Sequence, residues 1–383
     1  MRARVLLSSL VLTSLSLAAC GGGDGGDGGD ASDDQAVATT GSPAADTTAP
    51  ADTAALTTDP PATEPLATDV ATTVPESTVP PAEDLPTLAF TPQSAGPLQV
   101  TASQCTVEGI PDGVPGASVE SFAIDATHAY VPTEGGVAVL AFTAGADCSM
   151  TLDASIGDGG VLATPDEVDS VAVSATGRLA AAGLFNTTVF DVAAGLSYTC
   201  DQVTGDVDIT ADGTQVMTSF PGSPVEQYSL GDTTCGEATT VALPADIVDV
   251  YYVAYDGTDL FLGGQGPDDT IYAGRASGGA LQWKVGNAEV GGPGWIGWVH
   301  GLVPCDGGYC IVDTNTDKLI VTDAAGVLRA EFSISELIGE RMFYETAELG
   351  PDGALYVLAT DSAPDGAGGS NEGNYLVRIE VTG

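Results

Sequence analysis

The sequence predicts an all-β fold, a six-bladed β-propeller closed by an N-terminal strand. A strand-and-turn phrase recurs six times, on average about 45 residues apart, which is the period of a four-stranded propeller blade. From about Gly96 onward the chain is apolar and rich in glycine, and this stretch is long enough to bury a large core. The last copy of the phrase leaves room for three strands only, whereas an unmatched strand precedes the first copy.

The first twenty residues have the three parts of an export signal: a basic start, an apolar run from Val5 to Leu17, and small residues at the cut. The run of roughly 13 residues is too short for a transmembrane helix, which needs about 20. The ending Leu17-Ala18-Ala19-Cys20 resembles the lipobox of bacterial lipoproteins. The resemblance implies a signal peptide over residues 1–19 and acylation of Cys20 by chains such as palmitate. The protein would then be anchored to the lipid bilayer of the bacterial cell membrane and face the exterior.

Residues 20–92 are expected to be a disordered linker. They begin with glycine and aspartate and continue with threonine, alanine, proline and aspartate. Such a segment has too little apolar surface to offset the entropy lost on ordering. As a flexible coil of about 75 residues it would span about 45 to 50 Å. The expected organisation is therefore signal peptide 1–19, linker 20–92 and propeller 93–383.

The charge balance limits the partners. The chain has 53 acidic and 9 basic residues, and a formal net charge of −44. Such a field repels nucleic acid and attracts cations and basic partners, so nucleic-acid binding is excluded. Hydration in a salty exterior is a second explanation for the acids. The partners that remain are an envelope protein, a peptide or a glycan.

Six cysteines besides Cys20 predict disulfide bonds, because an even number in an exported domain is typical of them. Cys305 and Cys310 flank a turn sequence and are expected to clamp one hairpin. The other four allow three pairings, and the sequence does not choose among Cys105, Cys148, Cys200 and Cys235. A zinc site is the competing interpretation, but the cysteine spacing does not fit one and both histidines lie apart in sequence.

Each copy of the phrase is expected to be the inner strand of a blade running into a tight hairpin, where glycine and aspartate tolerate positive φ. The copies are residues 119–127, 168–177, 207–213, 249–257, 301–307 and 346–353. A second strand such as 354–358 and a third such as 375–379 follow. An unpaired edge invites aggregation, so the orphan strand from Leu98 to Val107 is expected to complete blade six and close the ring.

Residues 309–323 resemble the phrase that joins the second and third strands in NHL repeats, and residues 351–357 are similar. This resemblance covers the repeat region and implies a propeller fold.

Acidic residues begin the predicted inner strands. Aligned on the turns, Glu120, Asp169, Asp249 and Glu345 share one register, and Asp206 and His300 come one residue later. Carboxylates that converge at one mouth of the channel favour a hard cation such as Ca²⁺. In an alternative interpretation they are solvated strand ends of an acidic protein.

This arrangement is similar to the gluconolactonase and regucalcin-like lactonases, whose Glu, Asn and Asp metal ligands line such a mouth. His300-Gly301-Leu302 falls where that family has Asn-Gly-Leu. The resemblance implies a divalent-metal-dependent, lactonase-like hydrolase with a carboxylate or His300 as base. Near this strand, Trp295 and Trp298 are candidates for an aromatic wall or for packing between blades.

The chain contains neither G-x-S-x-G nor H-E-x-x-H. The predicted function is therefore a non-catalytic binding or scaffolding module at the cell envelope, with the lactonase-like hydrolase as the alternative.

Overall fold

The computed structural model describes residues 90–108, 122–133, 135–183, 185–200, 205–339, 342–361 and 374–383. The expected signal peptide, Cys20, most of the expected linker and Glu120 lie outside the described residues. Within them, no helix has both the length and the apolar character needed to span a membrane.

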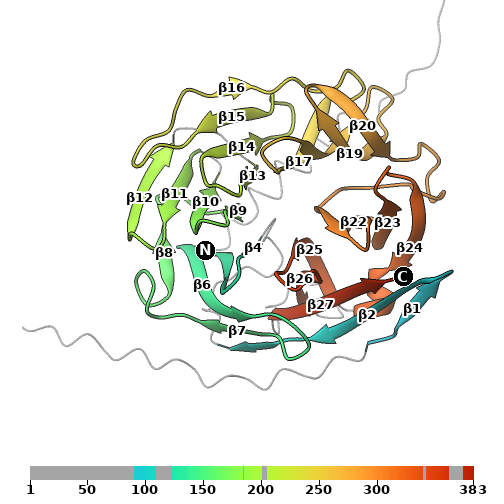
Figure 1. Ribbon diagram of the computed structural model, residues 1–383, viewed down its shortest axis with the longest axis horizontal. Coiled ribbons are helices and arrows are strands. Elements are labelled where there is room, and N and C mark those ends of the chain that lie inside the picture. Colours follow the sequence, from blue (N-terminus) through green and yellow to red (C-terminus); the bar gives the residue numbers. More distant parts are fainter. Residues whose placement is uncertain are drawn as a thin grey trace, which may run out of the picture. The chain divides into compact units, whose positions relative to one another are not determined.

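Six sheets, antiparallel except for one short outer strand, are arranged around a central channel, which confirms the all-β, six-bladed propeller (Figure 1). From the channel outward, blade 1 contains β4 (Ala123–Ile124), β5 (His128–Thr133), β6 (Gly136–Thr143) and β7 (Ser149–Leu152), with β8 (Val161–Ala163) also paired to β6. Blade 2 contains β9 (Ser170–Val173), β10 (Arg178–Ala182), β11 (Thr187–Asp191) and β12 (Leu196–Cys200). Blade 3 contains β13 (Asp206–Ile209), β14 (Gln215–Ser219), β15 (Glu226–Ser229) and β16 (Thr239–Thr240).

The other three blades follow the same order. Blade 4 contains β17 (Asp249–Tyr255), β18 (Leu260–Gln265), β19 (Ile271–Ser277) and β20 (Ala280–Val285). Blade 5 contains β21 (Gly301–Cys305), β22 (Gly308–Asp313), β23 (Lys318–Asp323) and β24 (Leu328–Ser333), which the short helix α2 (Ile334–Ile338) follows. Blade 6 contains β25 (Met342–Leu349), β26 (Leu355–Asp361), β27 (Asn374–Thr382), β2 (Leu98–Gln104) and β1 (Gln93–Ala95).

Each repeated phrase forms the innermost strand of a blade, as the sequence predicts. The turn of blade 5 shows why aspartate and glycine recur at the strand ends. Asp306 and Gly307 have φ of 37° and 73°, the left-handed values that a two-residue hairpin turn needs. At the next position, a Cβ on Gly308 would lie 1.9 Å from the carbonyl oxygen of Thr322, so only glycine fits there.

Apolar side chains fill the seams between blades. The described residues form six buried clusters, and each lies between one pair of neighbouring sheets. Between blades 1 and 2, for example, Tyr130, Val139, Leu179 and Phe190 pack together. Both faces of each blade are therefore buried, and the loops at the two ends of the strands remain to face other molecules.

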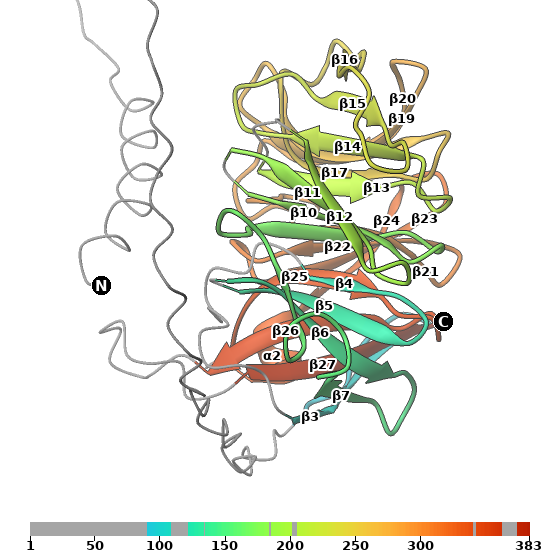
Figure 2. The same ribbon diagram turned by 90° about the vertical axis from the view of Figure 1, so that its left-hand side faces the viewer.

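The N-terminal segment differs from its expected course. The sequence predicts one strand from Leu98 to Val107 in blade 6, but the structure has two strands that belong to different blades. β2 pairs antiparallel with β27 of blade 6. The chain then bends at Cys105, and β3 (Thr106–Glu108) pairs parallel with β7 of blade 1. Figure 1 shows β2 running beside β27, and Figure 2 shows β3 beside β7. One short segment thus contributes strands to two blades.

Three disulfides are formed. Cys305–Cys310 clamps the hairpin of blade 5, which confirms the predicted pair. The pairing that the sequence left open is Cys105–Cys148 and Cys200–Cys235. Cys200 ends β12, the outermost strand of blade 2, and Cys235 precedes β16, the outermost strand of blade 3.

Candidate functional site

The predicted acidic positions lie at the same end of the inner strands. Asp206 and Asp249 begin β13 and β17, and Asp169 and His300 immediately precede β9 and β21. Glu345 lies within β25, but the structure does not describe its side chain. Glu120 lies outside the described residues altogether.

These side chains have separate partners. Asp249 Oδ1 accepts hydrogen bonds from the main-chain N–H groups of Gly222 (2.8 Å) and Val250 (3.0 Å). Asp206 accepts one from the Ser170 hydroxyl at 2.9 Å and one from the Val253 N–H at 2.8 Å. Across the described ranges, no three His, Cys, Asp or Glu side chains come together closely enough to hold a metal ion. The calcium site therefore stays a prediction.

Burial shifts the pKa values of Asp169 and His300. Burial, together with the nearby charge of Glu167, raises the pKa of Asp169 to about 6. Burial lowers the pKa of His300 to about 4, so its imidazole is neutral at pH 7. The Nδ1 atom of His300 lies 2.8 Å from the hydroxyl oxygen of Thr314. The ring of Trp298 lies 6.0 Å from the His300 ring and stacks on Tyr251 at 4.1 Å. Trp298 therefore packs across the seam between blades 4 and 5.

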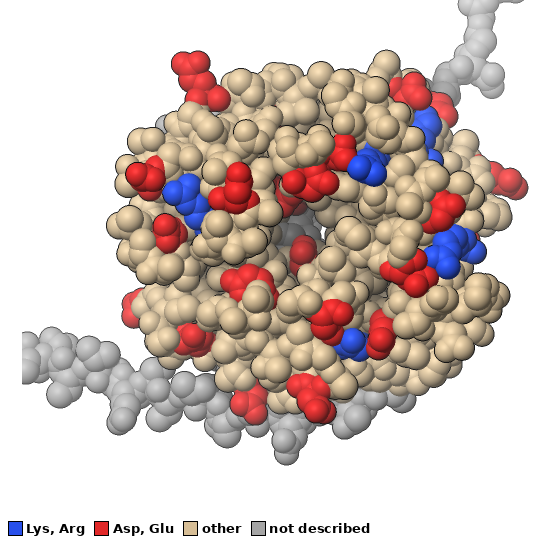
Figure 3. All heavy atoms as spheres, in the orientation of Figure 1, with Lys and Arg blue, Asp and Glu red and all other residues tan. Residues whose placement is uncertain are grey.

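The channel contains further acids that the sequence analysis did not single out. Asp208 follows Asp206 on the same face of β13, and Glu348 lies on β25 of blade 6. The face in Figure 3 is hollowed at its centre, with acidic atoms around and inside the hollow. The one sequence signal at these positions is an acid between apolar neighbours, as in Val207-Asp208-Ile209 and Ala347-Glu348-Leu349, and it does not tell a channel position from a position between blades.

The aspartates of β13 have a structural task. β17 is the innermost strand of its sheet, so the main-chain groups on its channel edge need partners from outside blade 4. Asp206 accepts the hydrogen bond of Val253 N–H, and Asp208 accepts that of Tyr255 N–H. The inner edge of β13 is capped in the same way, since Val207 N–H donates to the Ser170 hydroxyl of blade 2 at 3.3 Å. Side chains of one blade thus cap the inner edge of the next.

The electrostatics of this group are unfavourable at neutral pH. Burial raises the pKa of Asp206 to about 6, although hydrogen bonds oppose the shift. Burial and the charges of Asp206 and Asp256 raise the pKa of Asp208 to about 7. The pKa of Glu348 is raised well above its usual value by burial and by both aspartates. The Tyr252 hydroxyl, whose pKa is also raised by burial and by these acids, donates to the Leu302 carbonyl. The group therefore favours protonation.

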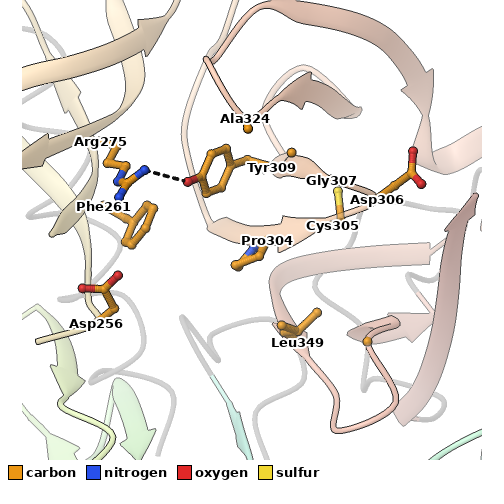
Figure 4. Close-up of a pocket in the computed structure, with 12 residues that line it drawn as sticks. Asp256, Phe261, Arg275, Pro304, Cys305, Asp306, Gly307, Tyr309, Ala324 and Leu349 are labelled. Atoms are coloured by element: carbon orange, nitrogen blue, oxygen red, sulfur yellow. Dashed lines mark hydrogen bonds between the residues drawn. The ribbon is translucent and has the colours of Figure 1, made fainter. Parts of the chain in front are cut away.

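A cavity of about 470 Å³ opens at the other end of the inner strands, where they enter their hairpin turns. Its walls come from blades 4, 5 and 6 (Figure 4): Asp256, Phe261, Arg275, Pro304, Cys305, Asp306, Gly307, Gly308, Tyr309, Ala324, Leu349 and Gly353. We call it the turn-face cavity. Its volume lies in the range of about 300 to 1,000 Å³ that is usual for ligand pockets.

No protein-family model matches the chain, and no curated protein matches it. Solved structures of similar shape include the hydrazine synthase of Kuenenia stuttgartiensis, at 12% identity and a TM-score of 0.43, covering 66% of this chain and 78% of that one. A second is the WD40 domain of Toxoplasma gondii coronin, at 10% identity and a TM-score of 0.46, covering 77% and 88%. The description of this chain as a propeller rests on its own six sheets.

Proposed function

We propose that this chain is a lipoprotein, anchored to the bacterial membrane through acylated Cys20, whose propeller faces the exterior as a non-catalytic binding or scaffolding module. One observation carries the binding role. The six sheets bury both faces of every blade against each other, while the turn face retains an open cavity lined by three blades. A rigid frame that presents loops and a concavity is suited to holding a partner.

The lipid anchor is supported by the sequence ending in Cys20 and is tested directly. In a bacterial host, the full chain is expected to partition into detergent and to incorporate a labelled fatty acid. The Cys20→Ala variant should lose both properties, because it lacks the sulfur atom to which the lipid would be attached. Ser8→Ala, within the same apolar run, is the matched control. A Cys20→Ala chain that still carries label would contradict the anchor.

The binding role is tested by photo-crosslinking in living cells. A photoreactive residue at Ala324, in the wall of the turn-face cavity, is expected to give discrete adducts larger than the chain itself. The same residue at Val248 is the control, because Val248 is 61% exposed but lies next to the start of β17, at the opposite end of the inner strand. Equal yields from both positions, or no adduct from Ala324, would contradict a specific binding face.

A further inference from the structure

The turn-face cavity lies where three consecutive hairpins meet. The inner strands β17 and β21 run into the turns at Asp256 and Asp306, and Gly353 belongs to the matching turn of blade 6. Side chains of the second and third strands of blade 4 complete the wall, with Phe261 on β18 and Arg275 on β19. Each of these groups is on a strand or in a tight turn, so the fold itself sets the shape of the cavity.

One side of the cavity presents hydrogen-bond donors without a strong net positive charge. The Arg275 guanidinium pairs with buried Asp259 through Nε and Nη2, and Nη1 donates to the Tyr309 hydroxyl at 3.3 Å. A guanidinium has five N–H donors, so the remaining ones are open to a ligand. Since Asp259 already neutralises the cation, these donors suit a neutral acceptor such as a peptide carbonyl better than a second carboxylate.

The rim has an acid with a free oxygen. Asp256 is exposed and lines the cavity. Its Oδ1 atom accepts hydrogen bonds from the N–H groups of Thr258 (2.9 Å) and Asp259 (2.8 Å). No described residue engages Oδ2. The other acid of the lining, Asp306, is paired with Arg329 at 2.9 Å. The uncompensated charge of the cavity is therefore negative and is located at Asp256.

The space between these polar groups is apolar. Phe261, Pro304 and Leu349 line it, and the Tyr309 ring lies 5.6 Å from the Phe261 ring (Figure 4). Rings and a proline offer flat surfaces that bind an apolar side chain at little entropic cost.

We propose that the turn-face cavity binds a peptide segment of a partner protein in which a lysine or arginine adjoins a bulky apolar residue. The apolar side chain occupies the space against Phe261, Pro304 and Leu349. A main-chain carbonyl accepts from Arg275, and the basic side chain pairs with Asp256. This inference rests on the proposed binding role and specifies the partner's chemistry.

Charge favours such a partner over the other occupants. The chain carries a formal charge of −44, so a basic segment is attracted from a distance and an acidic one is repelled. The chain's own residues 20–92 contain neither lysine nor arginine. They therefore lack the group that Asp256 would recognise.

The test is calorimetric titration of the chain with three blocked tetrapeptides at low salt. The probe is acetyl-Gly-Lys-Phe-Gly-amide, and the controls replace Lys by Glu or Phe by Gly. We expect saturable binding of the probe with a Kd below about 1 mM. The Glu peptide should bind at least about fivefold more weakly, and raising the salt should weaken the probe because the ion pair is exposed.

Protein variants assign the site. Ala324→Trp fills the cavity and should weaken the probe more than about tenfold, as expected when a buried apolar side chain loses its place. Asp256→Asn keeps the turn acceptor but removes the charge, and should weaken it about two- to fivefold. Asp212→Asn is the matched control, since its Oδ1 caps the equivalent turn of blade 3. Thermal melts verify that each variant is folded.

Each alternative result overturns the inference. These results are no saturable binding, equal binding of the Lys and Glu peptides, or an unchanged Kd in both Ala324→Trp and Asp256→Asn. Dimerisation of the chain that Ala324→Trp abolishes would assign the cavity to a second copy instead. If the peptide fails while adducts from position 324 still form in cells, this inference falls and the binding role stands. If the adducts are absent as well, both fall.

Discussion

The seam between blades 6 and 1 differs from the seam between blades 4 and 5 in what crosses it. At the first seam, consecutive residues bond to different blades: Cys105 N–H donates to the Leu376 carbonyl and Thr106 N–H to the Cys148 carbonyl, each at 2.9 Å. The Cys105–Cys148 disulfide lies at the same point. At the second seam, side chains make the contacts, as in the stack of Tyr251 on Trp298.

The difference reflects where the chain is continuous. Blades 4 and 5 are joined by residues 286–300, so covalent connection already keeps them adjacent. Blades 6 and 1 are connected only through the N-terminal segment, and main-chain pairing and a disulfide take the place of a loop. Among the described residues, the seam between blades 4 and 5 has neither of these links, and it borders the turn-face cavity together with blade 6.

Removing residues 93–108 should have the largest effect on stability, because this segment contributes strands to both blade 6 and blade 1. The deletion takes away Leu98, Val100 and Cys105, all at most 3% exposed, and each buried apolar side chain contributes about 1.5–3 kcal/mol. The total is comparable to the whole stability of a domain. We expect the melting temperature, followed by circular dichroism, to fall by more than about 10 °C. Deleting an equal length within residues 21–89 is the control, and an unchanged melting temperature would refute closure by this segment.

Removing disulfides separates the two kinds of fastening more finely. Cys105–Cys148 spans 43 residues and Cys305–Cys310 spans 5. Loop entropy then assigns them about 4 and about 2 kcal/mol. Urea unfolding of Cys105→Ala/Cys148→Ala should show the larger loss of unfolding free energy, and Cys305→Ala/Cys310→Ala the smaller. The reverse order would mean that the seam between blades 6 and 1 depends on its strands and not on its disulfide. The parent chain under reducing conditions gives the reference for losing all three bonds.

A third prediction concerns the buried carboxylates of the channel and the dependence of stability on pH. The folded-state pKa of Asp208, about 7, and that of Asp206, about 6, exceed the usual 3.8. The folded chain therefore binds more protons than the unfolded chain between pH 4 and 7. Its free energy of unfolding should therefore rise as the pH falls from 8 to 5. The loss of stability caused by ionising these buried acids is greatest above their folded-state pKa values.

Glu348→Gln is expected to remove part of this penalty. It should raise the unfolding free energy at pH 8 by about 1 kcal/mol and flatten the pH profile, because one buried charge facing Asp206, Asp208 and Tyr252 is gone. Urea unfolding between pH 5 and 8 measures the effect, with the exposed Glu237→Gln as control. Stability that stays level or falls from pH 8 to pH 5 would contradict the prediction, because it would mean that folding does not raise the pKa of these acids.

The same two seams show what sequence reasoning can reach. The inner strands were predictable because alternating apolar residues and Asp-Gly turns are local, and turns such as Asp306-Gly307 permit few other residue types. The fork at Cys105 was missed. The apolar positions shift there by one register, from 98, 100 and 102 to 105 and 107, but only the geometry of two adjacent blades shows that the two parts join different sheets. The Cys305–Cys310 pair followed from proximity in sequence, whereas Cys200–Cys235 depends on how one blade's outer strand meets the next.

The candidate sites show the same limit. Aligning the turns identified the end of the strand at which Asp206 and Asp249 lie, but not their partners, because Ser170 and Gly222 belong to the preceding blades. Asp208 and Glu348 were missed because both faces of an inner strand contact other blades or the channel, and periodicity alone does not separate these environments. The turn-face cavity depends on the spacing of three blades, which no single phrase encodes.

Calcium gives the smallest expected effect and tests whether a cation can fasten the seam between blades 4 and 5. Asp249 and His300 begin the inner strands on the two sides of that seam, and their side chains now have separate partners. A cation would have to displace some of these hydrogen bonds, so we expect weak binding. At about ten times a millimolar Kd, binding to the native state adds about 1.4 kcal/mol, which raises the melting temperature by a few degrees. Magnesium at equal ionic strength is the control for screening, and Asp249→Asn should remove the shift specific to calcium. If calcium and magnesium give the same melting curve as sodium, the strand-start acids are solvated ends and caps, and the seam depends on packing alone.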